Sequence, residues 1–455
     1  MIDFEKIAKY SKSGPRYTSY PTAVEFHEGF QESDYIQALE QSNSSALPLS
    51  LYFHLPFCKS ACYFCGCNVI YTNNEEKKQG YIPYLKKELE LLKRYLDVQR
   101  EVIQLHFGGG TPTYFQAHHL EVIIDLIHQT FPHFSNQIEA SCEIDPRFFN
   151  KDQMRVLKDG GFNRVSFGVQ DFNPIVQKAI NRFQSVDLVS NAVNIARDFG
   201  IRSINFDLIL GLPHQSKESF LETLQTVVSL NPDRLAIFNY AHMPWIKKTM
   251  QKIPSDALPT PQEKLKILES SIKFLKDNGY ELIGMDHFAK KDDELFLTMK
   301  NGELRRNFQG YTTKGFSQTI GVGVTSIGEG ANYYVQNQKD LKAYMQSLDE
   351  DRLPVHKGIW LSDEDCLRKE VIMQIMNNLR LDYSSINQRF GIDCKQHFSQ
   401  ALEALKEYEE IGFIESDENG FRATPTGGMM IRNIAMEFDA YLSRAADQQR
   451  FSKTL

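Results

Sequence analysis

The sequence has 455 residues, of which 42% are hydrophobic and 24% are charged, and its formal net charge is −7 at pH 7. This composition excludes a wholly disordered chain, and no run approaches the roughly 18 to 20 apolar residues of a membrane span. The charge is spread without long blocks of one sign, which argues against nucleic acid as the main partner. We therefore expect a cytoplasmic globular protein of two or three domains, or one large barrel with an appendage.

Residues 1–50 are polar and rich in turn-forming residues, and we expect them to form an N-terminal arm. Within them, the stretch 13–21 contains Gly14, Pro15 and Pro21, which indicates extended backbone rather than a core element. Arg16 could contact an anionic ligand. The commoner role of such an arm is to pack on its own domain.

A repeated unit extends from residue 51 to about residue 239. In each unit a short apolar run ends at polar residues or glycines. An amphipathic helical stretch follows, such as residues 75–96. This alternation predicts parallel βα units, because a parallel connection needs a crossover of about a dozen residues. The six expected strands are Leu51–Leu55, Val102–Phe107, Ile138–Ile144, Arg164–Val169, Ile201–Leu210 and Arg234–Phe238.

Polar residues follow the carboxyl end of nearly every expected strand. Sheets and barrels of the α/β class place their chemistry at this end. Six strands are fewer than the eight of a closed barrel, so the sequence predicts an α/β fold with an open, partial parallel βα barrel and one active face. This face would contain the cysteine loop after residue 57, the glycine loop at residues 108–113, Glu143, Gln170, Asp207 and residues 239–241.

Two further segments follow the six units. A helix is expected over residues 262–278, and an apolar run occupies residues 280–285. Residues 320–328 are similar to a dinucleotide-binding fingerprint, but Ser326 replaces its third glycine. We therefore do not expect nucleotide binding there.

From residue 358 the sequence is mainly helical. Helices are expected over residues 363–377 and 397–411, and a small hairpin is expected to turn at Asn419-Gly420. The hairpin is acidic, which favours a lid or interaction domain over a DNA-binding one. The sequence thus predicts a partial barrel with an extension at 51–357 and a mainly helical C-terminal domain at 358–455.

Four of the seven cysteines lie within ten residues: Cys58, Cys62, Cys65 and Cys67. Such crowding indicates a metal site, or disulfides in a secreted protein, and the lack of a secretory leader favours metal. Structural zinc sites usually use two pairs of ligands two to four residues apart, and the pair around Gly66 is closer than this. The first three cysteines suit a cubane iron–sulfur cluster with one iron open to a small molecule.

This three-cysteine spacing resembles the signature of radical S-adenosylmethionine enzymes. Within that superfamily, the chain is similar to oxygen-independent coproporphyrinogen III oxidases from Gly14 to near its C-terminus. The similar segments are Tyr-Phe-Cys-Gly-Cys at 63–67, Gly-Gly-Gly-Thr-Pro-Thr at 108–113, Gly-Val-Gln-Asp-Phe at 168–172, Phe-Asn-Tyr-Ala-His at 238–242 and Asn-Phe-Gln-Gly-Tyr-Thr-Thr at 307–313. Haem chaperones of the superfamily generally lack the fourth cysteine, Cys67, and the segment at 307–313. This chain has both.

The resemblance implies a role for each of these segments. The thiolates of Cys58, Cys62 and Cys65 would bind a [4Fe-4S] cluster, and Cys67 would be a catalytic residue close to the cluster without ligating it. Gln309 and Ile327 would contact a second S-adenosylmethionine molecule. The first S-adenosylmethionine would contact Tyr52, Phe64, Gly109, Gly110, Thr111 and Glu143, with Gln170, Arg182, Asp207 and Ala241 at further cofactor-binding positions.

The implied reaction is oxidative decarboxylation of two propionates of coproporphyrinogen III to vinyl groups, giving protoporphyrinogen IX in haem biosynthesis. One electron from a reductase or flavodoxin-type partner would reduce the cluster, and a 5′-deoxyadenosyl radical would abstract a substrate hydrogen. Arg16, Arg305 and Arg306 are candidates to bind the four substrate carboxylates. We expect a monomer. The alternatives are a haem-binding chaperone of the same superfamily and a structural zinc protein with a helical nucleic-acid domain.

Overall fold

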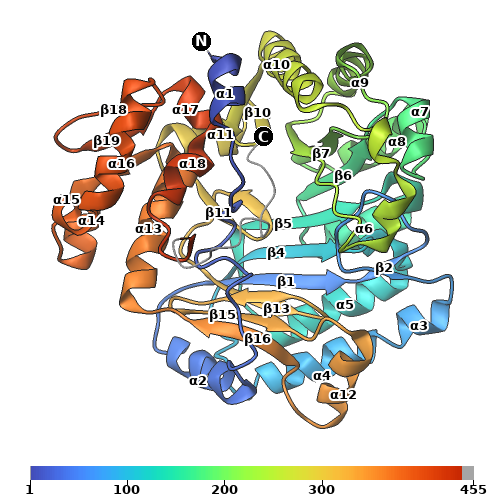
Figure 1. The fold of residues 1–455 in the computed structure, drawn as a ribbon. Helices are drawn as coiled ribbons and strands as arrows, with labels where there is room; N and C mark the ends of the chain where they lie inside the picture. Colours follow the sequence, from blue (N-terminus) through green and yellow to red (C-terminus); the bar gives the residue numbers. More distant parts are fainter. Residues whose placement is uncertain (1, 443–455) are drawn as a thin grey trace. The chain divides into compact units, whose positions relative to one another are not determined.

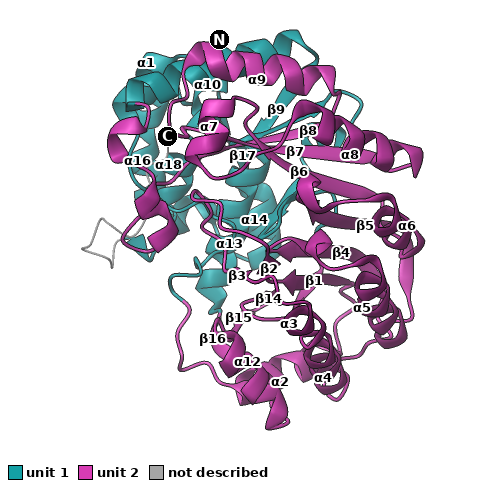
Figure 2. Ribbon diagram, turned by 90° about the vertical axis from the view of Figure 1, so that its right-hand side faces the viewer, with its two compact units in different colours: residues 1–25, 260–315, 361–455 teal, residues 26–259, 316–360 magenta. Residues whose placement is uncertain are grey.

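The computed structural model describes residues 2–442, and the chain divides into two compact units (Figure 2). Each unit is assembled from segments that are far apart in the sequence. Residues 443–455 of the predicted C-terminal domain lie outside the described part. The first unit contains residues 1–25, 260–315 and 361–455, and the second contains residues 26–259 and 316–360.

The second unit is built on a sheet in which all six predicted strands are present (Figure 1). Each strand pairs in parallel with the next along the chain, so every connection is a crossover. The prediction of an α/β fold with an open parallel βα sheet is confirmed. The strands are β1 (Leu49–Leu55), β4 (Val102–Gly109), β5 (Phe134–Ile144), β6 (Arg164–Gln170), β7 (Ser203–Leu210) and β8 (Arg234–Asn239).

A further parallel strand lies outside the predicted six. This strand, β13 (Gln318–Val322), pairs with β1 on the side opposite β4. Gly321 occupies a crowded position in it, since a Cβ there would lie 2.7 Å from the carbonyl oxygen of Ile327. Glycine is depleted in strands, so its presence concealed this one. The antiparallel strands β14 (Ile327–Glu329), β15 (Tyr333–Asn337) and β16 (Val355–Trp360) extend the sheet beyond β13.

Helices pack in a chain along the outside of this sheet (Figure 2). Helix α4 (Ile82–Leu92) contacts α5 (Ala117–Thr130), α5 contacts α6 (Lys151–Asp159), and α6 contacts α8 (Val186–Asp198). These contacts leave the carboxyl ends of the strands to the loops, which carry the predicted site residues.

The prediction of one continuous helix over residues 75–96 is wrong. Helix α3 (Glu75–Gln79) ends at Gly80, and α4 begins after Tyr81, with Pro83 in its first turn. Proline is tolerated in a first turn but disrupts a helix interior, which is why two helices form. The predicted apolar side is confirmed, because at most 3% of each leucine at positions 85, 89, 92 and 96 is exposed.

The N-terminal fifty residues are more ordered than an extended arm. They contain α1 (Phe4–Tyr10), whose cap Asp3 accepts from the backbone of the first turn, and α2 (Glu32–Ser42). Tyr17 and Tyr20 are only 1% and 0% exposed, so the prediction that residues 13–21 are not a core element is wrong. A helix of seven residues is too short to show an apolar period, which explains why α1 is not apparent in the sequence.

The first unit contains the helices and the hairpin predicted for the later part of the chain. Its small hairpin, β18 (Ile414–Ser416) with β19 (Gly420–Ala423), turns at the predicted Asn419-Gly420. None of the helices in residues 2–442 is both long and apolar enough to cross a bilayer. The other elements of the first unit include α10 (Pro261–Asp277), β9 (Tyr280–Gly284), β10 (His287–Lys290), β11 (Arg305–Asn307), β12 (Gly310–Thr312), α13 (Asp363–Asn378), α16 (Ser399–Glu410) and α18 (Ile431–Met436).

One buried carboxylate attaches α4 to the edge of the sheet. Glu88 of α4 is 2% exposed and accepts from the backbone N–H of Gly323 at 2.8 Å, from the Asn337 amide at 2.6 Å and from the Tyr344 hydroxyl at 2.6 Å. Burial raises the pKa of Glu88 to about 7, while the three donors favour its charged form. One side chain thus joins α4 to three later segments of the second unit.

We expect Glu88→Ala to lower the free energy of unfolding by roughly 3 kcal/mol, because three buried donors lose their acceptor. The control is Glu90→Ala on the same helix, where the side chain is 59% exposed and lies 3.8 Å from Lys86. This change should cost no more than about 0.5 kcal/mol. Urea unfolding followed by circular dichroism measures both, and equal midpoints would show that Glu88 does not anchor α4.

Candidate active site

The cysteine loop is closed at its base by a short pairing of strands. Strand β2 (Phe57–Cys58) pairs in parallel with β3 (Ile70–Tyr71), on either side of the loop. Farther along, the backbone N–H of Tyr63 donates to the carbonyl of Ile180 at 3.0 Å. The loop is therefore held in place by tertiary contacts rather than by secondary structure of its own.

The four thiols of this loop lie close enough to change one another's ionisation. Cys62 is buried, Cys58 and Cys65 are half-buried, and Cys67 is exposed. Burial raises the pKa of Cys58 to about 12, and neighbouring thiolates add to this rise. A hydrogen bond from Cys67 lowers the pKa of Cys65 to about 6, and the same bond raises the pKa of Cys67. Cys67 is thus in contact with Cys65.

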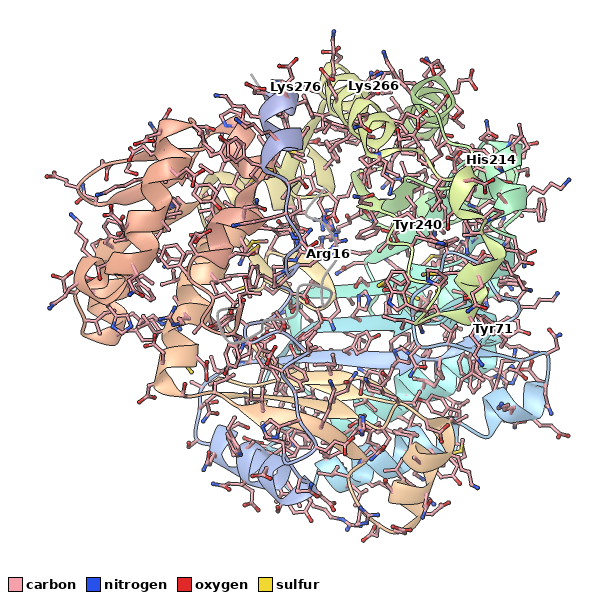
Figure 3. The ribbon with its side chains drawn as sticks, in the orientation of Figure 1. Arg16, Tyr71, His214, Tyr240, Lys266 and Lys276 are labelled. Atoms are coloured by element: carbon pink, nitrogen blue, oxygen red, sulfur yellow. The ribbon has the colours of Figure 1, made fainter. Side chains whose placement is uncertain are left out.

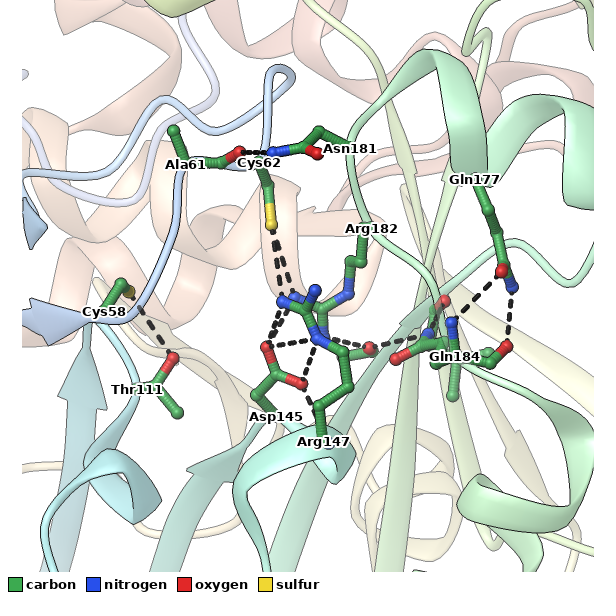
Figure 4. A network of polar contacts seen from close by, with 12 residues as sticks. Cys58, Ala61, Cys62, Thr111, Asp145, Arg147, Gln177, Asn181, Arg182 and Gln184 are labelled. Carbon is green, nitrogen blue, oxygen red and sulfur yellow. Dashed lines mark hydrogen bonds and ion pairs between the residues drawn. The ribbon is translucent and has the colours of Figure 1, made fainter. Parts of the chain in front are cut away.

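Two guanidinium groups and one carboxylate surround Cys62 (Figure 4). Arg182 Nη1 and Arg147 Nη2 lie 3.6 and 3.7 Å from Cys62 Sγ. Asp145 accepts from Arg182 at 2.9 Å and from Arg147 Nε and Nη2 at 2.9 and 2.7 Å. Burial opposes ionisation of Asp145, but the Arg182 charge and the Arg147 hydrogen bonds hold its pKa below the usual value. Two cations face one carboxylate and one thiol, so the charges balance when Cys62 is a thiolate.

Three elements converge to make this network. Asp145 and Arg147 come directly after β5, and Arg182 follows helix α7 (Pro174–Ala179). Arg182 also donates through Nη2 to the carbonyl of Gly168 in β6 at 2.5 Å. Its guanidinium is thereby fixed between two strand ends.

The glycine loop after β4 lies against the start of the cysteine loop. The backbone N–H of Gly110 donates to the carbonyl of Leu55 at 2.9 Å, and that of Thr111 donates to the carbonyl of Phe57 at 3.0 Å. The hydroxyl of Thr111 lies 3.4 Å from Cys58 Sγ. The two loops therefore form one rigid edge.

This close approach requires glycine. Gly109 has a φ of +112°, and a Cβ there would lie 2.6 Å from the ring of His54. A Cβ on Gly110 would lie 2.6 Å from the backbone of Pro56. In the structure the groups that approach these glycines are the protein's own, and their contact with a cofactor stays a prediction.

Glu143 is positioned near the end of β5 by the neighbouring strand. Its Oε1 lies 3.3 Å from Nε2 of His106, whose Nδ1 lies 2.5 Å from the Ser141 hydroxyl, and its Oε2 accepts from the N–H of Gly109 at 3.3 Å. Burial opposes its ionisation, but His106 and Gly109 lower its pKa. The side chain is 45% exposed, so a ligand with donor groups can reach this carboxylate.

Tyr52 continues this polar layer onto β1. Its ring stacks on that of His106 with centroids 5.8 Å apart, and its hydroxyl lies 3.0 Å from Nδ1 of His54. The other nitrogen of His54 lies 3.0 Å from the carbonyl of Asn68 in the cysteine loop. These contacts connect the sheet interior to the loop.

Asp207 of β7 lies farther along the same edge. Its two oxygens accept from the hydroxyl of Ser166 at 2.7 Å and from the amide of Asn205 at 2.9 Å. Gln170, the last residue of β6, has a positive φ of 65°, which turns the chain away from the sheet. Gln170 therefore lies at the predicted strand end, whereas Asp207 lies inside β7, three residues before its end.

The remaining predicted residues occupy several settings. Phe64 packs against the apolar cluster that includes Tyr240, Ala241 follows β8, and Ile327 begins β14. Gln309 lies in the turn between β11 and β12 and belongs to the first unit, whereas the others belong to the second. Their roles in binding a cofactor stay predictions.

Several residues of the site lie outside the predicted set, among them His54, His106, Asp145 and Arg147. His106 is a polar residue among buried neighbours of β4, and this position was its only sequence signal. Asp145 and Arg147 come directly after β5, where polar residues at a strand end are the sequence signal. A stricter reading of residues beyond each strand end would have found Arg147.

The donor set of the loop fits an iron–sulfur cluster. Within residues 2–442, no three His, Cys, Asp or Glu side chains gather closely enough to hold a single metal ion. A cubane instead takes thiolates on separate iron atoms. The loop offers Cys58, Cys62 and Cys65 for this, with cationic donors on one of them.

Two protein-family models match regions of the chain. Residues 52–227 match the Radical SAM superfamily, and residues 361–430 match the HemN C-terminal domain. The parallel sheet with the three-cysteine loop at its carboxyl edge is thus that of a radical S-adenosylmethionine enzyme.

Relatives are similar over the whole chain. The oxygen-independent coproporphyrinogen III oxidase of Helicobacter pylori strain J99 is 61% identical, covering 100% of this chain and 99% of its own. That of Escherichia coli K12 is 45% identical, covering 100% and 98%. A solved structure, the coproporphyrinogen III oxidase of Escherichia coli, has a TM-score of 0.91 and 43% identity, covering 97% of this chain and 99% of its own. The chain belongs to the family of oxygen-independent coproporphyrinogen III oxidases.

We expect Arg147→Met to make the reduction potential of a bound cluster more negative, because a donor and a positive charge beside Cys62 are lost. A shift of about 60 mV would correspond to a tenfold change in a one-electron equilibrium. Redox titration followed by electron paramagnetic resonance measures it. Arg155→Met is the control, since this arginine is 61% exposed and lies 3.8 Å from Asp152. The same potential in both variants would show that Arg147 does not act on the cluster.

Proposed function

We propose that this protein converts coproporphyrinogen III to protoporphyrinogen IX by oxygen-independent oxidative decarboxylation of two propionates. The observation that carries the proposal is the loop of Cys58, Cys62 and Cys65 at the carboxyl edge of the parallel sheet. This loop occurs in a chain that matches, over its full length, relatives that are named for this activity. The place of the reaction would be haem biosynthesis in the cytoplasm.

The three cysteines would hold a [4Fe-4S] cluster. When bound, the cluster and S-adenosylmethionine supply a carbon-centred radical that removes a hydrogen atom from the substrate. Arg147 and Arg182 would fix the Cys62 sulfur in place, because both donate toward it. Asp145 would hold both guanidiniums in that orientation.

The polar strand ends would position S-adenosylmethionine. Glu143 is suited to accept from its ammonium group, and Asp207 from its ribose hydroxyls, since each carboxylate is oriented by neighbours. The glycine loop at residues 108–113 would lie alongside the S-adenosylmethionine molecule. Tyr52, Phe64, Gly109, Gly110, Thr111, Gln170, Arg182 and Ala241 would complete this site, with Gln309 and Ile327 contacting a second S-adenosylmethionine molecule.

Cys67 would be a catalytic residue that does not ligate the cluster. It is exposed, and its carbonyl accepts from Lys247 Nζ at 2.8 Å. Its thiol is free of the arginine network around Cys62 and contacts Cys65 instead. This places a reactive sulfur beside the cluster ligands.

The electron would come from a reductase or flavodoxin-type protein, and the enzyme would act as a monomer. Trp245 and Ile246 are 75% and 62% exposed and directly precede Lys247, which contacts the cysteine loop. Exposed apolar side chains therefore adjoin the proposed cluster site, as a docking partner requires.

The direct test is anaerobic turnover with S-adenosylmethionine, a reductant and coproporphyrinogen III. The expected products are protoporphyrinogen IX and 5′-deoxyadenosine. Absence of both would sink the proposal. Stable haem binding without a vinyl product would instead identify a haem-binding chaperone.

We expect Cys58→Ser, Cys62→Ser and Cys65→Ser each to lose most of the bound iron and the absorbance near 400 nm, because each removes one thiolate ligand. Cys67→Ser should keep the iron and lose turnover. Cys366→Ser in α13 is the control that should keep both. Iron analysis of anaerobically purified protein checks this, and iron loss confined to Cys67→Ser would contradict the assignment.

A further inference from the structure

A largely buried carboxylate in the first unit is the centre of a charged cluster. Asp286 lies in the turn between β9 and β10, and its side chain is 10% exposed. One of its oxygens accepts from Arg16, which is labelled in Figure 3 and lies on the segment after α1. The other oxygen lies 2.7 Å from Nδ1 of His287. Both oxygens of this carboxylate are thus already engaged.

Arg306 of β11 belongs to the same cluster and lacks a comparable partner. Its guanidinium carbon lies 4.9 Å from the centroid of the Tyr311 ring, across the β11–β12 hairpin. Its Nη1 lies 2.9 Å from Sδ of Met285, which is a weak acceptor. Its buried Nε has no hydrogen-bond partner among residues 2–442. A buried guanidinium N–H is costly when unpaired, so this group is suited to an acceptor from outside the chain.

Arg432 of α18 adds a third guanidinium. It is 6% exposed and donates through Nε to the carbonyl of Pro15 at 2.8 Å and through Nη2 to that of Gly14. Both acceptors are neutral. Burial, followed by the charge of Arg16, lowers the pKa of Arg432 to about 9, and the charge of Arg306 acts in the same direction. Three guanidiniums therefore lie in the electrostatic neighbourhood of Asp286.

We propose that Arg16, Arg306 and Arg432 form a carboxylate-binding site, with Asp286 as the internal counter-ion that orders it. The ligand would be a propionate of the tetracarboxylate substrate, so this inference rests on the proposed function. A carboxylate fits because a planar guanidinium can donate two parallel N–H bonds to it. The cluster supplies three such groups.

Arg305, a candidate for the same role from the sequence, has a different environment. Its Nη1 lies 3.7 Å from Oε1 of Glu370 in α13. Successive side chains of a strand point to opposite faces, so Arg305 and its neighbour Arg306 face different surroundings. Arg389 also pairs with Glu370 at 2.7 Å, which means that Glu370 keeps a partner when Arg305 is replaced. The role of Arg305 stays a prediction from the sequence, whereas Arg432 joins the proposed site because of its contacts.

A second source could supply the carboxylate. Gln309, proposed to contact a second S-adenosylmethionine, lies in the same β11–β12 hairpin as Arg306. S-adenosylmethionine carries a carboxylate of its own. The test therefore measures the binding of each compound separately.

The experiment titrates coproporphyrin III, the stable oxidised tetracarboxylate, into anaerobically purified holoenzyme and follows porphyrin fluorescence. We expect Arg306→Gln to weaken binding by at least about tenfold, because a charge-assisted bond is lost. Arg422→Gln is the control, since this arginine of the first unit is 74% exposed and pairs with Glu415 at 3.0 Å, and it should change binding by less than about twofold. The tetramethyl ester of coproporphyrin should bind the wild type and Arg306→Gln equally. Circular dichroism checks that each variant is folded.

Arg306→Lys keeps the charge and provides a second variant if Arg306→Gln does not fold. It should still bind coproporphyrin more weakly than the wild type, because an ammonium cannot donate two parallel bonds. Wild-type affinity in the folded Arg306 variants would overturn the site. Weakened S-adenosylmethionine binding with unchanged coproporphyrin binding would overturn the propionate assignment. Binding is measured without turnover, so Arg306-dependent binding by a protein that makes no product would refute the proposed function and leave the site standing.

Discussion

The parallel pairing of β1 with β4 continues beyond the ends of both strands as backbone hydrogen bonds, and the site depends on this continuation. Gly110 and Thr111 donate to the carbonyls of Leu55 and Phe57, which brings the glycine loop onto the first residues of the cysteine loop. The approach is possible because no Cβ occupies the space next to Pro56. Cys58 therefore starts from a rigid position, although the loop that follows has no regular structure.

Electrostatics then distinguish the thiols of that loop. Cys62 is buried beside two guanidiniums that share Asp145, while Cys67 is exposed and contacts Cys65. A buried thiolate requires compensating charge, and Arg147 and Arg182 supply it. The same spacing of cysteines thus produces different chemical environments, which agrees with a division into cluster ligands and a separate reactive thiol.

A carboxylate that orders arginines occurs in each unit, with a different consequence. Around Asp145 the charges balance if Cys62 is ionised, so the network serves the protein's own sulfur. Around Asp286 three arginines gather, and the buried Nε of Arg306 has no hydrogen-bond partner within residues 2–442. Because an unpaired buried donor is costly, the second cluster is suited to a ligand and the first to a metal site.

The sequence by itself determined the parallel sheet and the chemistry of the cysteine loop, because alternating strand and helix patterns and cysteine spacing are local features. It also placed Glu143 and Gln170 at strand ends, since the apolar runs that end there are visible in the sequence. It did not indicate β13, because Gly321, which the close approach of the Ile327 backbone requires, weakens the strand signal. Only the tertiary structure decided that Arg147 meets Cys62, 85 residues away, and that Arg432 meets Gly14, 418 residues away. Such contacts depend on how helices and strands pack together in three dimensions. The periodicity of apolar residues along the sequence indicates only local secondary structure and does not predict these contacts.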